Sequence, residues 1–338
     1  MNHPPRLSVI IPLMNEAESL PELYRELREA LHLWADCCEL IFIDDGSTDN
    51  SFSVLEKLHT EDPRVIVLRF RRNQGKASAL MAGFRRAKGN IVITLDADLQ
   101  DDPKEIPRFL HKLEEGFDLV SGWKVTRHDP FIRRGLSRVF NRVTALLTGV
   151  TLHDFNCGFK CYRRDVIREI RLYGELHRFI PALASWRGFR IAEIEVAHRP
   201  RKYGLSKYGS ERIPHGFFDL LTVLMLTRYQ MRPLHFFGKL GMLQGLLGFV
   251  ALMYLIIGWF FGHWIGSRPL LSLSILAMII GLQFIFFGLL AEMIVNSGKH
   301  DAPPIAAVLD QHDPFSQHST PVLAAANAHS DTERADSP

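Results

Sequence analysis

Short apolar runs alternate with longer amphipathic stretches over the first hundred residues of this chain. Between the runs, apolar residues recur at helical spacing, as Leu20, Leu23 and Leu27 do. This alternation predicts a series of βαβ units, in which crossover helices cover a parallel sheet. The runs with the length and β-branched composition of buried strands are Leu7–Ile11, Glu39–Ile43, Val65–Leu68 and Ile91–Leu95.

The pattern becomes less regular between residues 118 and 200. Two further strand candidates, Leu119–Gly122 and Ile191–Ala197, stand near the two ends of this region. A basic segment, Lys124–Arg142, follows the first of them. We expect the region to complete a single domain over residues 1–212.

The composition becomes strongly apolar after Arg212. Residues 213–235 have few charges and helical character, which predicts amphipathic helices that lie on a bilayer surface. The runs Leu240–Gly262 and Leu270–Val295 follow. At about 1.5 Å of rise per residue, each exceeds the roughly 30 Å of hydrocarbon in a bilayer. We therefore predict two transmembrane helices within residues 236–298, with a buried helical hairpin of a soluble protein as the alternative.

Positive charges lie mainly at the outer ends of the two apolar runs rather than in the loop between them. Arg228, Arg232 and Lys239 precede the first run and Lys299 follows the second, whereas the intervening loop holds only Arg268. The positive-inside rule then places both ends in the cytoplasm. No apolar signal segment precedes the first strand, so we expect a multi-pass protein of the cytoplasmic (inner) membrane with a cytoplasmic catalytic domain. Residues 299–338 lack periodicity, which predicts a disordered tail.

Composition and charge narrow the range of partners. The chain has 40 Lys and Arg against 37 Asp and Glu, and a net charge of +3 is too weak to indicate nucleic acid. Its four cysteines have neither zinc-site spacing nor the pattern of a secreted disulfide framework. They are expected to be reduced thiols in the cytosol.

Polar residues follow the ends of the predicted strands, where ligands of open parallel sheets bind. Pro12, Asn15 and Glu16 end the first strand, and no G-x-G-x-x-G is present there, which disfavours a dinucleotide and hydride transfer. Asp44 and Asp45 end the second. Their carboxylates can accept hydrogen bonds from a ribose or a base, while Gly46 lets the backbone turn tightly.

The most informative run follows the fourth strand and reads Asp96-Ala97-Asp98-Leu99-Gln100. On an extended backbone, its two carboxylates and its amide would lie on one side. Such oxygen ligands suit Mg²⁺ or Mn²⁺, which also bind substrate phosphates. A solvated turn or a helix cap is the alternative for an isolated motif of this kind. Lys76 stands at the start of the third predicted helix, whose N-terminal N–H groups can bind an anion. The alternative interpretation of Lys76 is a solvated helix residue.

Together these residues resemble family 2 glycosyltransferases, in the branch of the dolichol-phosphate mannose synthases and bacterial polyprenyl-phosphate glycosyltransferases. The resemblance covers about residues 7–297. The motifs that carry it stand in order along the chain: Pro12-x-x-Asn15-Glu16, Asp44-Asp45-Gly46-Ser47-x-Asp49, Asn73-x-Gly75-Lys76, Asp96-Ala97-Asp98-Leu99-Gln100-x-x-Pro103, Asp154-Phe155-Asn156-Cys157-Gly158-Phe159 and Arg201-x-x-Gly204-x-Ser206-Lys207-Tyr208.

The resemblance implies an α/β glycosyltransferase-A fold, Rossmann-like with a mostly parallel sheet, followed by interfacial helices and a transmembrane hairpin. It also implies inverting, metal-dependent transfer of a hexose from a nucleotide-diphosphate sugar to a membrane polyprenyl phosphate, undecaprenyl or dolichyl. UDP-glucose or a related UDP-sugar is favoured as donor over GDP-mannose. The residues implied in nucleotide-sugar binding are Pro12, Asn15, Glu16, Asp44, Asp45, Lys76, Asp96, Arg201, Ser206 and Lys207.

Within that set, Asp44 and Asp45 would hold the nucleoside, and Asp96 the ribose or the sugar diphosphate. Asp98 and Gln100 would hold the Mg²⁺ or Mn²⁺ ion. Asp154 joins Asp96 and Asp98 as a catalytic candidate that orients acceptor or sugar, or else is a turn carboxylate. Arg201, Ser206 and Lys207 resemble a mobile loop that closes over the donor and excludes water.

An acceptor phosphate is already an anion, so it needs cationic positioning more than a general base. Arginine suits phosphate geometry especially well. Many relatives carry an arginine near the position of Lys124, so the identity of the phosphate ligand stays open. A basic stripe attracted to anionic lipid headgroups is the alternative for the segment. The acceptor-phosphate candidates are Lys124, Arg127, Arg133, Arg134 and Ser137.

Two other functions share part of this pattern. A processive polysaccharide synthase shares the acidic motifs but needs a Q-x-x-R-W motif, and Trp186-Arg187 has the wrong order. A catalytically inactive membrane scaffold conflicts with the intact acidic motifs. The expected partners are the nucleotide sugar, the polyprenyl phosphate and the bilayer, with a homo-oligomer possible and no nucleic acid. His198 is expected to be structural, and Glu292, at the end of the second span, has no predicted catalytic role.

Overall fold

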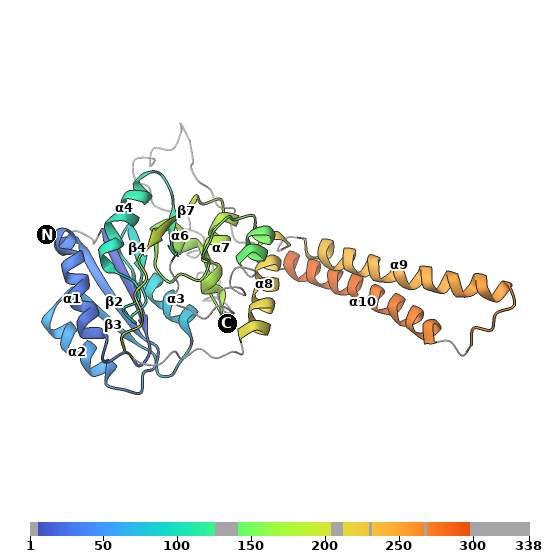
Figure 1. The fold of residues 1–338 in the computed structure, drawn as a ribbon, viewed down its shortest axis with the longest axis horizontal. Coiled ribbons are helices and arrows are strands. Elements are labelled where there is room, and N and C mark those ends of the chain that lie inside the picture. Colours follow the sequence, from blue (N-terminus) through green and yellow to red (C-terminus); the bar gives the residue numbers. More distant parts are fainter. Residues whose placement is uncertain (1–5, 126–140, 204–211, 230–231, 267–268, 298–338) are drawn as a thin grey trace, which may run out of the picture. The chain divides into compact units, whose positions relative to one another are not determined.

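A computed structural model describes residues 6–125, 141–203, 212–229, 232–266 and 269–297 (Figure 1). In these residues a seven-stranded sheet has the order β3-β2-β1-β4-β6-β5-β7. Strand β6 runs antiparallel to β4 and β5, and the other neighbouring pairs are parallel. The strands are β1 (Leu7–Leu13), β2 (Cys38–Asp44), β3 (Val65–Arg69), β4 (Ile91–Thr94), β5 (Leu119–Lys124), β6 (Lys160–Arg163) and β7 (Ile191–Val196).

All six predicted strands are present, and the mostly parallel sheet is confirmed. Strand β6 was not predicted, because Lys160–Arg163 is short and carries a charge at each end. It fills the position between β4 and β5, so the antiparallel strand lies directly beside the strand that ends in the acidic run.

Helices cover both faces of the sheet because the side chains of each strand alternate between the faces. In β1, Val9 and Ile11 belong to one apolar core cluster and Ile10 to the other. The first cluster packs under α1 (Leu20–Ala30), α2 (Ser51–Glu61) and α4 (Ile106–Glu114). The second packs under α3 (Lys76–Arg86), α6 (Arg164–Glu169) and α7 (Ile180–Trp186). Short 3-10 turns complete the layers: η1 (His32–Cys37), η2 (Pro103–Glu105) and η3 (Leu176–Phe179).

Helix α8 (Arg212–Arg228) belongs to the second layer. Its Leu220 and Val223 are buried in the same cluster as Ile10, so one face of the helix packs against the domain. The predicted interfacial stretch over residues 213–235 is therefore divided, because α8 ends at Arg228 and the next helix starts at Pro233. Its position on a bilayer stays a prediction.

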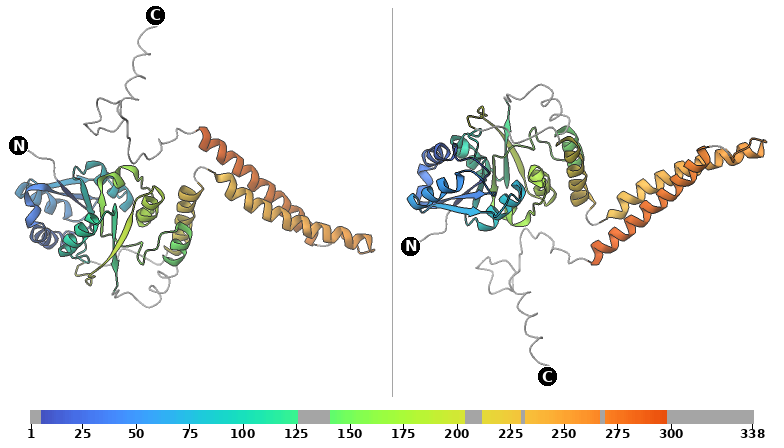
Figure 2. Two further views of the ribbon diagram at one scale, coloured as in Figure 1. Left: turned by 90° about the horizontal axis from the view of Figure 1, so that it is seen from above. Right: turned by 90° about the horizontal axis from the view of Figure 1, so that it is seen from below.

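Helices α9 (Pro233–Phe260) and α10 (Pro269–Ser297) are long and apolar enough to cross a membrane. They contain the two predicted spans and run side by side as a hairpin in all views (Figures 1 and 2). Only 17% of the most apolar window of each helix is buried, which disfavours the buried hairpin of a soluble protein. Glycines allow the close approach, since a Cβ added at Gly281 would lie 2.6 Å from the carbonyl oxygen of Gly241.

Candidate active site

The loops after β1 and β2 are bonded to each other, as expected for strand ends at one edge of a sheet. The side-chain oxygen of Asn15 accepts the N–H of Thr48 at 2.8 Å, and the N–H of Asn15 donates to Ser47 Oγ at 2.8 Å. Asn15 has a φ of +52°, which Asn tolerates better than most residues. Pro12 lies one residue before the end of β1, so the strand is one residue longer than its proline suggests.

The paired carboxylates after β2 bond to the backbone. Asp44 Oδ1 accepts the N–H of Ser47 at 2.7 Å. Asp45 accepts the N–H groups of Gln74 at 2.7 Å and Gly75 at 3.0 Å. Burial raises the pKa of Asp45, although the two N–H groups favour its charged form. Asp45 thus fixes the loop that leads into α3, and the contact of either carboxylate with a nucleoside stays a prediction.

Gly46 confirms the expected tight turn between these carboxylates and the rest of the loop. Its φ is +74°, and a Cβ there would lie 2.6 Å from the backbone carbon of Arg72. A side chain at this position would therefore push apart the loops that follow β2 and β3.

Lys76 is not a solvated helix residue. Its Nζ lies 2.5 Å from Asp96 Oδ1, at the start of α3. Burial opposes ionisation of Asp96, but the charges of Lys76 and Lys124 hold its pKa at about 2. Gly158 approaches from β6's side, where an added Cβ would lie 2.5 Å from Asp96 Oδ2. The sequence predicts this carboxylate, and the structure adds its lysine partner.

The acidic run after β4 is a turn, so the expected extended backbone is wrong. Strand β4 ends at Thr94, and Leu99 has a φ of +60° while its side chain is buried. Burial requires the apolar side chain there, at the cost of a left-handed backbone. Asp98 Oδ1 accepts the N–H of Gln100 at 3.2 Å within this turn. Burial, together with the neighbouring charge of Asp96, raises the pKa of Asp98.

Arg201 reaches the same turn from the segment after β7. Its Nη2 lies 2.6 Å from Asp98 Oδ2, and its Nη1 lies 3.9 Å from Glu16 Oε1. Arg201 therefore connects the predicted metal ligand with the loop after β1. Two other members of the predicted closing loop, Ser206 and Lys207, lie outside the described residues.

Ion pairs attach the segment that carries Arg201 to the rest of the domain. Arg199 lies 2.8 Å from Glu26 of α1 and 2.5 Å from Asp102. Lys202 lies 2.7 Å from Glu22, one turn earlier on α1. His198 forms an isolated β-bridge with Asp101, and its structural role stays a prediction. The segment is held on both sides of Arg201.

Of the acceptor-phosphate candidates, the structure describes Lys124. Its Nζ lies 2.7 Å from Asp101 Oδ1, and both side chains are largely buried. Burial disfavours the ammonium, yet the charge of Asp101 raises the pKa of Lys124. Lys124 is thus paired inside the domain, and its contact with an acceptor phosphate stays a prediction. The other candidates lie outside the described residues: Arg127, Arg133, Arg134 and Ser137.

Asp154 is buried within a turn, and its role in orienting the acceptor or the sugar stays a prediction. It is a turn carboxylate, because Oδ1 accepts the N–H of Asn156 at 3.0 Å. It is also buried, and its own N–H donates to Glu193 of β7 at 2.9 Å. The negative charges of Asp154 and Asp96 both favour the protonated form of Lys160. Asp154 is therefore placed on the side of the site that β6 forms.

Sequence reasoning missed two basic residues beside Asp96. Lys160 is 2% exposed, and its ammonium donates to the carbonyl of Cys157. Burial and the charge of Lys76 lower the pKa of Lys160. Burial also keeps the pKa of His177 well below its usual range, so that histidine is neutral at physiological pH. A lone lysine within the apolar run around Phe159 was the available signal for the first, and the sequence carries no comparable signal for the second.

The acidic turn suits a divalent cation that also binds a ligand. Asp98 supplies carboxylate oxygens, and Arg201 already places a positive charge against them. Within the described ranges, no three His, Cys, Asp or Glu side chains converge as a complete metal cage. Mg²⁺ and Mn²⁺ fit such a set, because they accept few carboxylates and complete their shell with phosphate oxygens and water. The oxygen donors of Asp98 and Gln100 are compatible with these ions.

Comparison with known proteins identifies the family of the chain. Residues 8–171 match the model of glycosyl transferase family 2. A dodecaprenyl-phosphate galacturonate synthase of Rhizobium johnstonii is 38% identical over 92% of this chain and 94% of its own length. An undecaprenyl-phosphate 4-deoxy-4-formamido-L-arabinose transferase of Proteus mirabilis is 39% identical over 86% of this chain and 88% of its own.

Solved structures support the fold. Glucosyl-3-phosphoglycerate synthase from Mycobacterium tuberculosis, in complex with Mn²⁺, uridine diphosphate and glucosyl-3-phosphoglycerate, superposes with a TM-score of 0.52. It covers 66% of this chain and 80% of its own, at 18% identity. The glycosyltransferase-A fold is thereby confirmed, and the two apolar helices together with the relatives indicate a membrane protein. The chain belongs to glycosyl transferase family 2 and is an enzyme of the branch that contains the polyprenyl-phosphate glycosyltransferases.

Proposed function

We propose that this enzyme transfers a hexose or related sugar, with inversion, from a nucleotide-diphosphate donor to a polyprenyl phosphate. The observation that carries the proposal is the charge alternation at the end of β4. Asp96 and Asp98 each contact a cation, Lys76 at 2.5 Å and Arg201 at 2.6 Å. Such a site can hold a diphosphate and a divalent ion together. The names of the relatives support a polyprenyl-phosphate acceptor.

The donor end of the reaction needs stabilisation of a leaving diphosphate. Lys76 and Arg201 can exchange their carboxylate partners for phosphate oxygens, because guanidinium and ammonium groups bind both. Asp98 and Gln100 would hold a Mg²⁺ or Mn²⁺ ion, which neutralises the charge that develops on the diphosphate. Asp96 would contact the ribose or the sugar diphosphate. Closure of the loop that contains Arg201, Ser206 and Lys207 would exclude water that hydrolyses the donor.

The acceptor end needs little proton chemistry. A polyprenyl phosphate oxygen is already a nucleophilic anion, so no general base has to remove a proton. Asp154 would orient the acceptor or the sugar from the side of β6. The basic segment that begins at Lys124 would position the phosphate, next to the cytoplasmic face of the membrane that α9 and α10 cross. Both chain ends would lie in the cytoplasm.

For the donor, we propose a UDP-sugar, UDP-glucose or a related sugar, with GDP-mannose as the less favoured choice. The relatives are named for galacturonate and for 4-deoxy-4-formamido-L-arabinose, so the donor panel has to include sugars with a carboxylate and with a substituted amine. Base and sugar selection depend on pocket shape rather than on the acidic motifs.

The test is a transfer assay with full-length protein in detergent. Radiolabelled UDP- and GDP-sugars are offered together with undecaprenyl phosphate, with Mg²⁺ or Mn²⁺ and with a chelator. The proposal predicts one sugar unit per lipid, found only when a divalent ion is present. A polymeric product would favour a processive synthase, and absence of any lipid product despite donor binding would favour a scaffold.

A further inference from the structure

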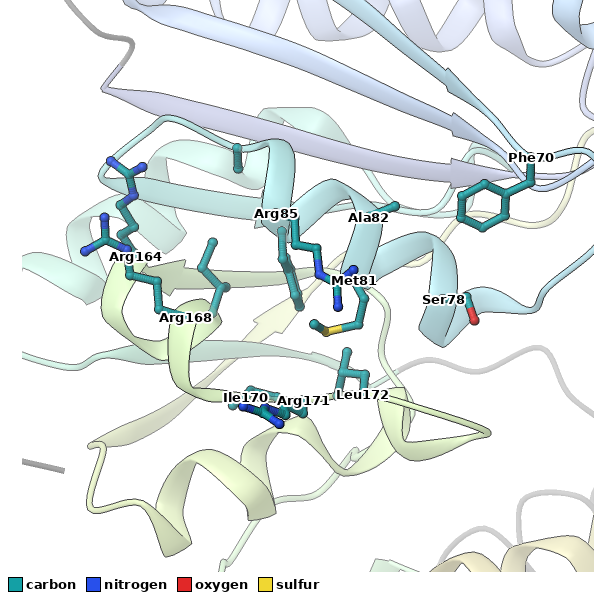
Figure 3. Close-up of a pocket in the computed structure, with 13 residues that line it drawn as sticks. Phe70, Ser78, Met81, Ala82, Arg85, Arg164, Arg168, Ile170, Arg171 and Leu172 are labelled. Carbon is teal, nitrogen blue, oxygen red and sulfur yellow. The ribbon is translucent and has the colours of Figure 1, made fainter. Parts of the chain in front are cut away.

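A pocket of about 950 Å³ opens between α3 and α6, on the sheet face opposite α1, α2 and α4 (Figure 3). None of its lining residues belongs to the candidate active site. Apolar side chains and arginines share the lining. The lining includes Met81, Leu172, Arg85, Arg164, Arg168 and Arg171.

Figure 3 shows how the charges are arranged. Arg164 and Arg168, both from α6, group at one end of the pocket, and Arg85 extends from α3 beside Met81. Arg171 lies at the opposite wall, in the segment that follows α6. An amphiphile with an anionic head would therefore meet guanidinium groups and apolar surface in the same pocket.

Few carboxylates line this pocket in the described part of the chain. No Asp or Glu is among the described residues that line this pocket. A smaller pocket of about 380 Å³ shares Arg164 and Arg168 and contributes one carboxylate, Asp165. Glu169 of α6 lies 3.8 Å from Arg187 and is not among the lining residues. Arg85, Arg164 and Arg168 outnumber that one lining carboxylate, so the described lining favours an anion.

The chemistry of the lining favours a phosphate ester. Arginine presents a planar set of N–H donors that matches phosphate oxygens, and several arginines can share one phosphate. The backbone also fixes part of the set, since Arg164 Nη1 donates to the carbonyl of Lys88 at 3.1 Å. The apolar side chains, Met81 and Leu172 among them, would contact the glycerol and acyl carbons of a lipid.

Connectivity favours a lipid as the source of that phosphate. Leu220 and Val223 of α8 are buried in the same core cluster as Leu172, so α8 and the pocket share one sheet face. Helix α8 ends at Arg228 and the first apolar helix starts at Pro233. Five peptide steps span at most about 18 Å. The chain therefore keeps the end of α8 close to the membrane helix.

We propose that the pocket between α3 and α6 binds the phosphate headgroup of an anionic membrane phospholipid. This binding is separate from the acceptor lipid and from the acidic turn. It would attach the domain to negatively charged bilayers. A phosphatidylcholine headgroup would bind more weakly, because its positive choline group would be repelled by the same arginines.

The experiment uses the full-length protein in bilayer nanodiscs of phosphatidylcholine that contain phosphatidylglycerol with a photoactivatable acyl chain. After illumination, mass spectrometry measures labelling of the peptides that contain Met81 and Leu172. The test variant is Arg85→Gln with Arg168→Gln, both exposed side chains. The matched control is Arg25→Gln with Arg108→Gln, which removes the same charge from exposed arginines on α1 and α4.

The proposal predicts labelling of both peptides in the wild type and in the control. In the test variant this labelling falls at least about tenfold, because two charge-assisted contacts are lost. Labelling of α9 and α10 stays equal in all three proteins and reports intact insertion. Unlabelled pocket peptides in the wild type, or equal labelling in the test variant, would overturn the proposal.

A second arm distinguishes the lipid from free phosphate. Labelling is repeated with excess inorganic phosphate and, separately, with sodium chloride at the same ionic strength. A lipid site predicts the same labelling in both. Loss of labelling only with phosphate would show a site for a soluble phosphate compound and overturn the lipid assignment.

Discussion

Arg201 and Asp98 are bound to each other, with Nη2 of the arginine 2.6 Å from Oδ2 of the carboxylate. The other oxygen of Asp98 accepts the N–H of Gln100. Both oxygens of the predicted metal ligand are therefore engaged by the protein. A divalent ion held by Asp98 would be repelled by the guanidinium of Arg201, so Arg201 would have to move for such an ion to bind.

The first prediction concerns Arg201→Ala. Removal of the guanidinium leaves Asp98 without its counter-charge, so Mn²⁺ should bind the donor-free enzyme about tenfold more tightly, the factor that ~1.4 kcal/mol represents. Turnover should fall by roughly 100-fold, because the leaving diphosphate loses a donor. Electron paramagnetic resonance of free Mn²⁺ measures the affinity without any reaction. Lys202→Ala, on the same segment, is the control and should leave the Mn²⁺ affinity unchanged. Weaker Mn²⁺ binding in the Arg201 variant would show that the arginine does not compete.

The second prediction concerns the contact between Gly158 and Asp96. A Cβ at position 158 would lie 2.5 Å from Asp96 Oδ2, so Gly158→Ala should displace that carboxylate from Lys76. We expect at least about tenfold lower transfer with only a small change in thermal stability, because the residue lies at the site and not in the apolar core. Gly245→Ala, which meets open space, is the control. Full activity in Gly158→Ala would exclude a tight constraint on Asp96.

Much of this architecture could be predicted from the sequence. The apolar runs around Val9 and Ile41 are long and uniform, and such runs predict buried parallel strands well. The carboxylates after β2 and β4 could be predicted as neighbours, because strand ends of a parallel sheet share one edge. The ion pairs that these carboxylates form could not be predicted. Lys76 and Arg201 reach Asp96 and Asp98 from segments distant in sequence, and only the fold brings them together.

Other predictions failed for reasons that lie in the local sequence. The acidic run was expected to be extended, but Leu99 turns its side chain into the core and takes a positive φ. Strand β6 escaped detection because Lys160 interrupts its apolar pattern, although that lysine is buried beside Asp96. The charge within this apolar run therefore lies at the site, where Asp96 acts on it.

A third prediction concerns acid stability. Asp62 accepts hydrogen bonds from Arg64, 2.7 Å away, and from Tyr24, 2.8 Å away, and chiefly the arginine lowers its pKa from 3.8 to about 2. The folded pKa lies below the unfolded one, so this stabilisation is present above pH 3.8 and is lost as the pH falls through about 2. Asp62→Asn should lower the free energy of unfolding by about 2 kcal/mol at pH 7.

Chemical unfolding of wild type and Asp62→Asn, at pH 7 and at pH 3, measures this effect. The difference between the two proteins should shrink at the lower pH. Glu29→Gln is the control, because Glu29 pairs with Arg25 on an exposed helix surface and should change stability by less than about 0.5 kcal/mol at either pH. A difference for Asp62→Asn that is the same at both values would contradict the ionic origin of the effect.

The fourth prediction concerns the membrane hairpin. Gly281 faces the backbone of α9, and a Cβ there would lie 2.7 Å from the backbone nitrogen of Gly245. Gly281→Ala should therefore destabilise the pair of helices by about 1–3 kcal/mol through overpacking. Gly245→Ala places its methyl group in open space and should be neutral. Thermal unfolding in detergent compares the two, and equal stability would mean that the helices do not pack at these glycines.

Sugar transfer by Asp98→Asn, beside the wild type, examines the reaction itself. Both full-length proteins receive the donor that the panel identifies, undecaprenyl phosphate, and either Mg²⁺ or a chelator, and label is counted in the lipid phase. The wild type should transfer label only with the ion. Asp98→Asn should fold normally but transfer at least about 100-fold more slowly, since it lacks the charge that holds the ion. Transfer by the wild type in chelator, or by Asp98→Asn at the wild-type rate, would contradict a metal-dependent glycosyl transfer at this turn.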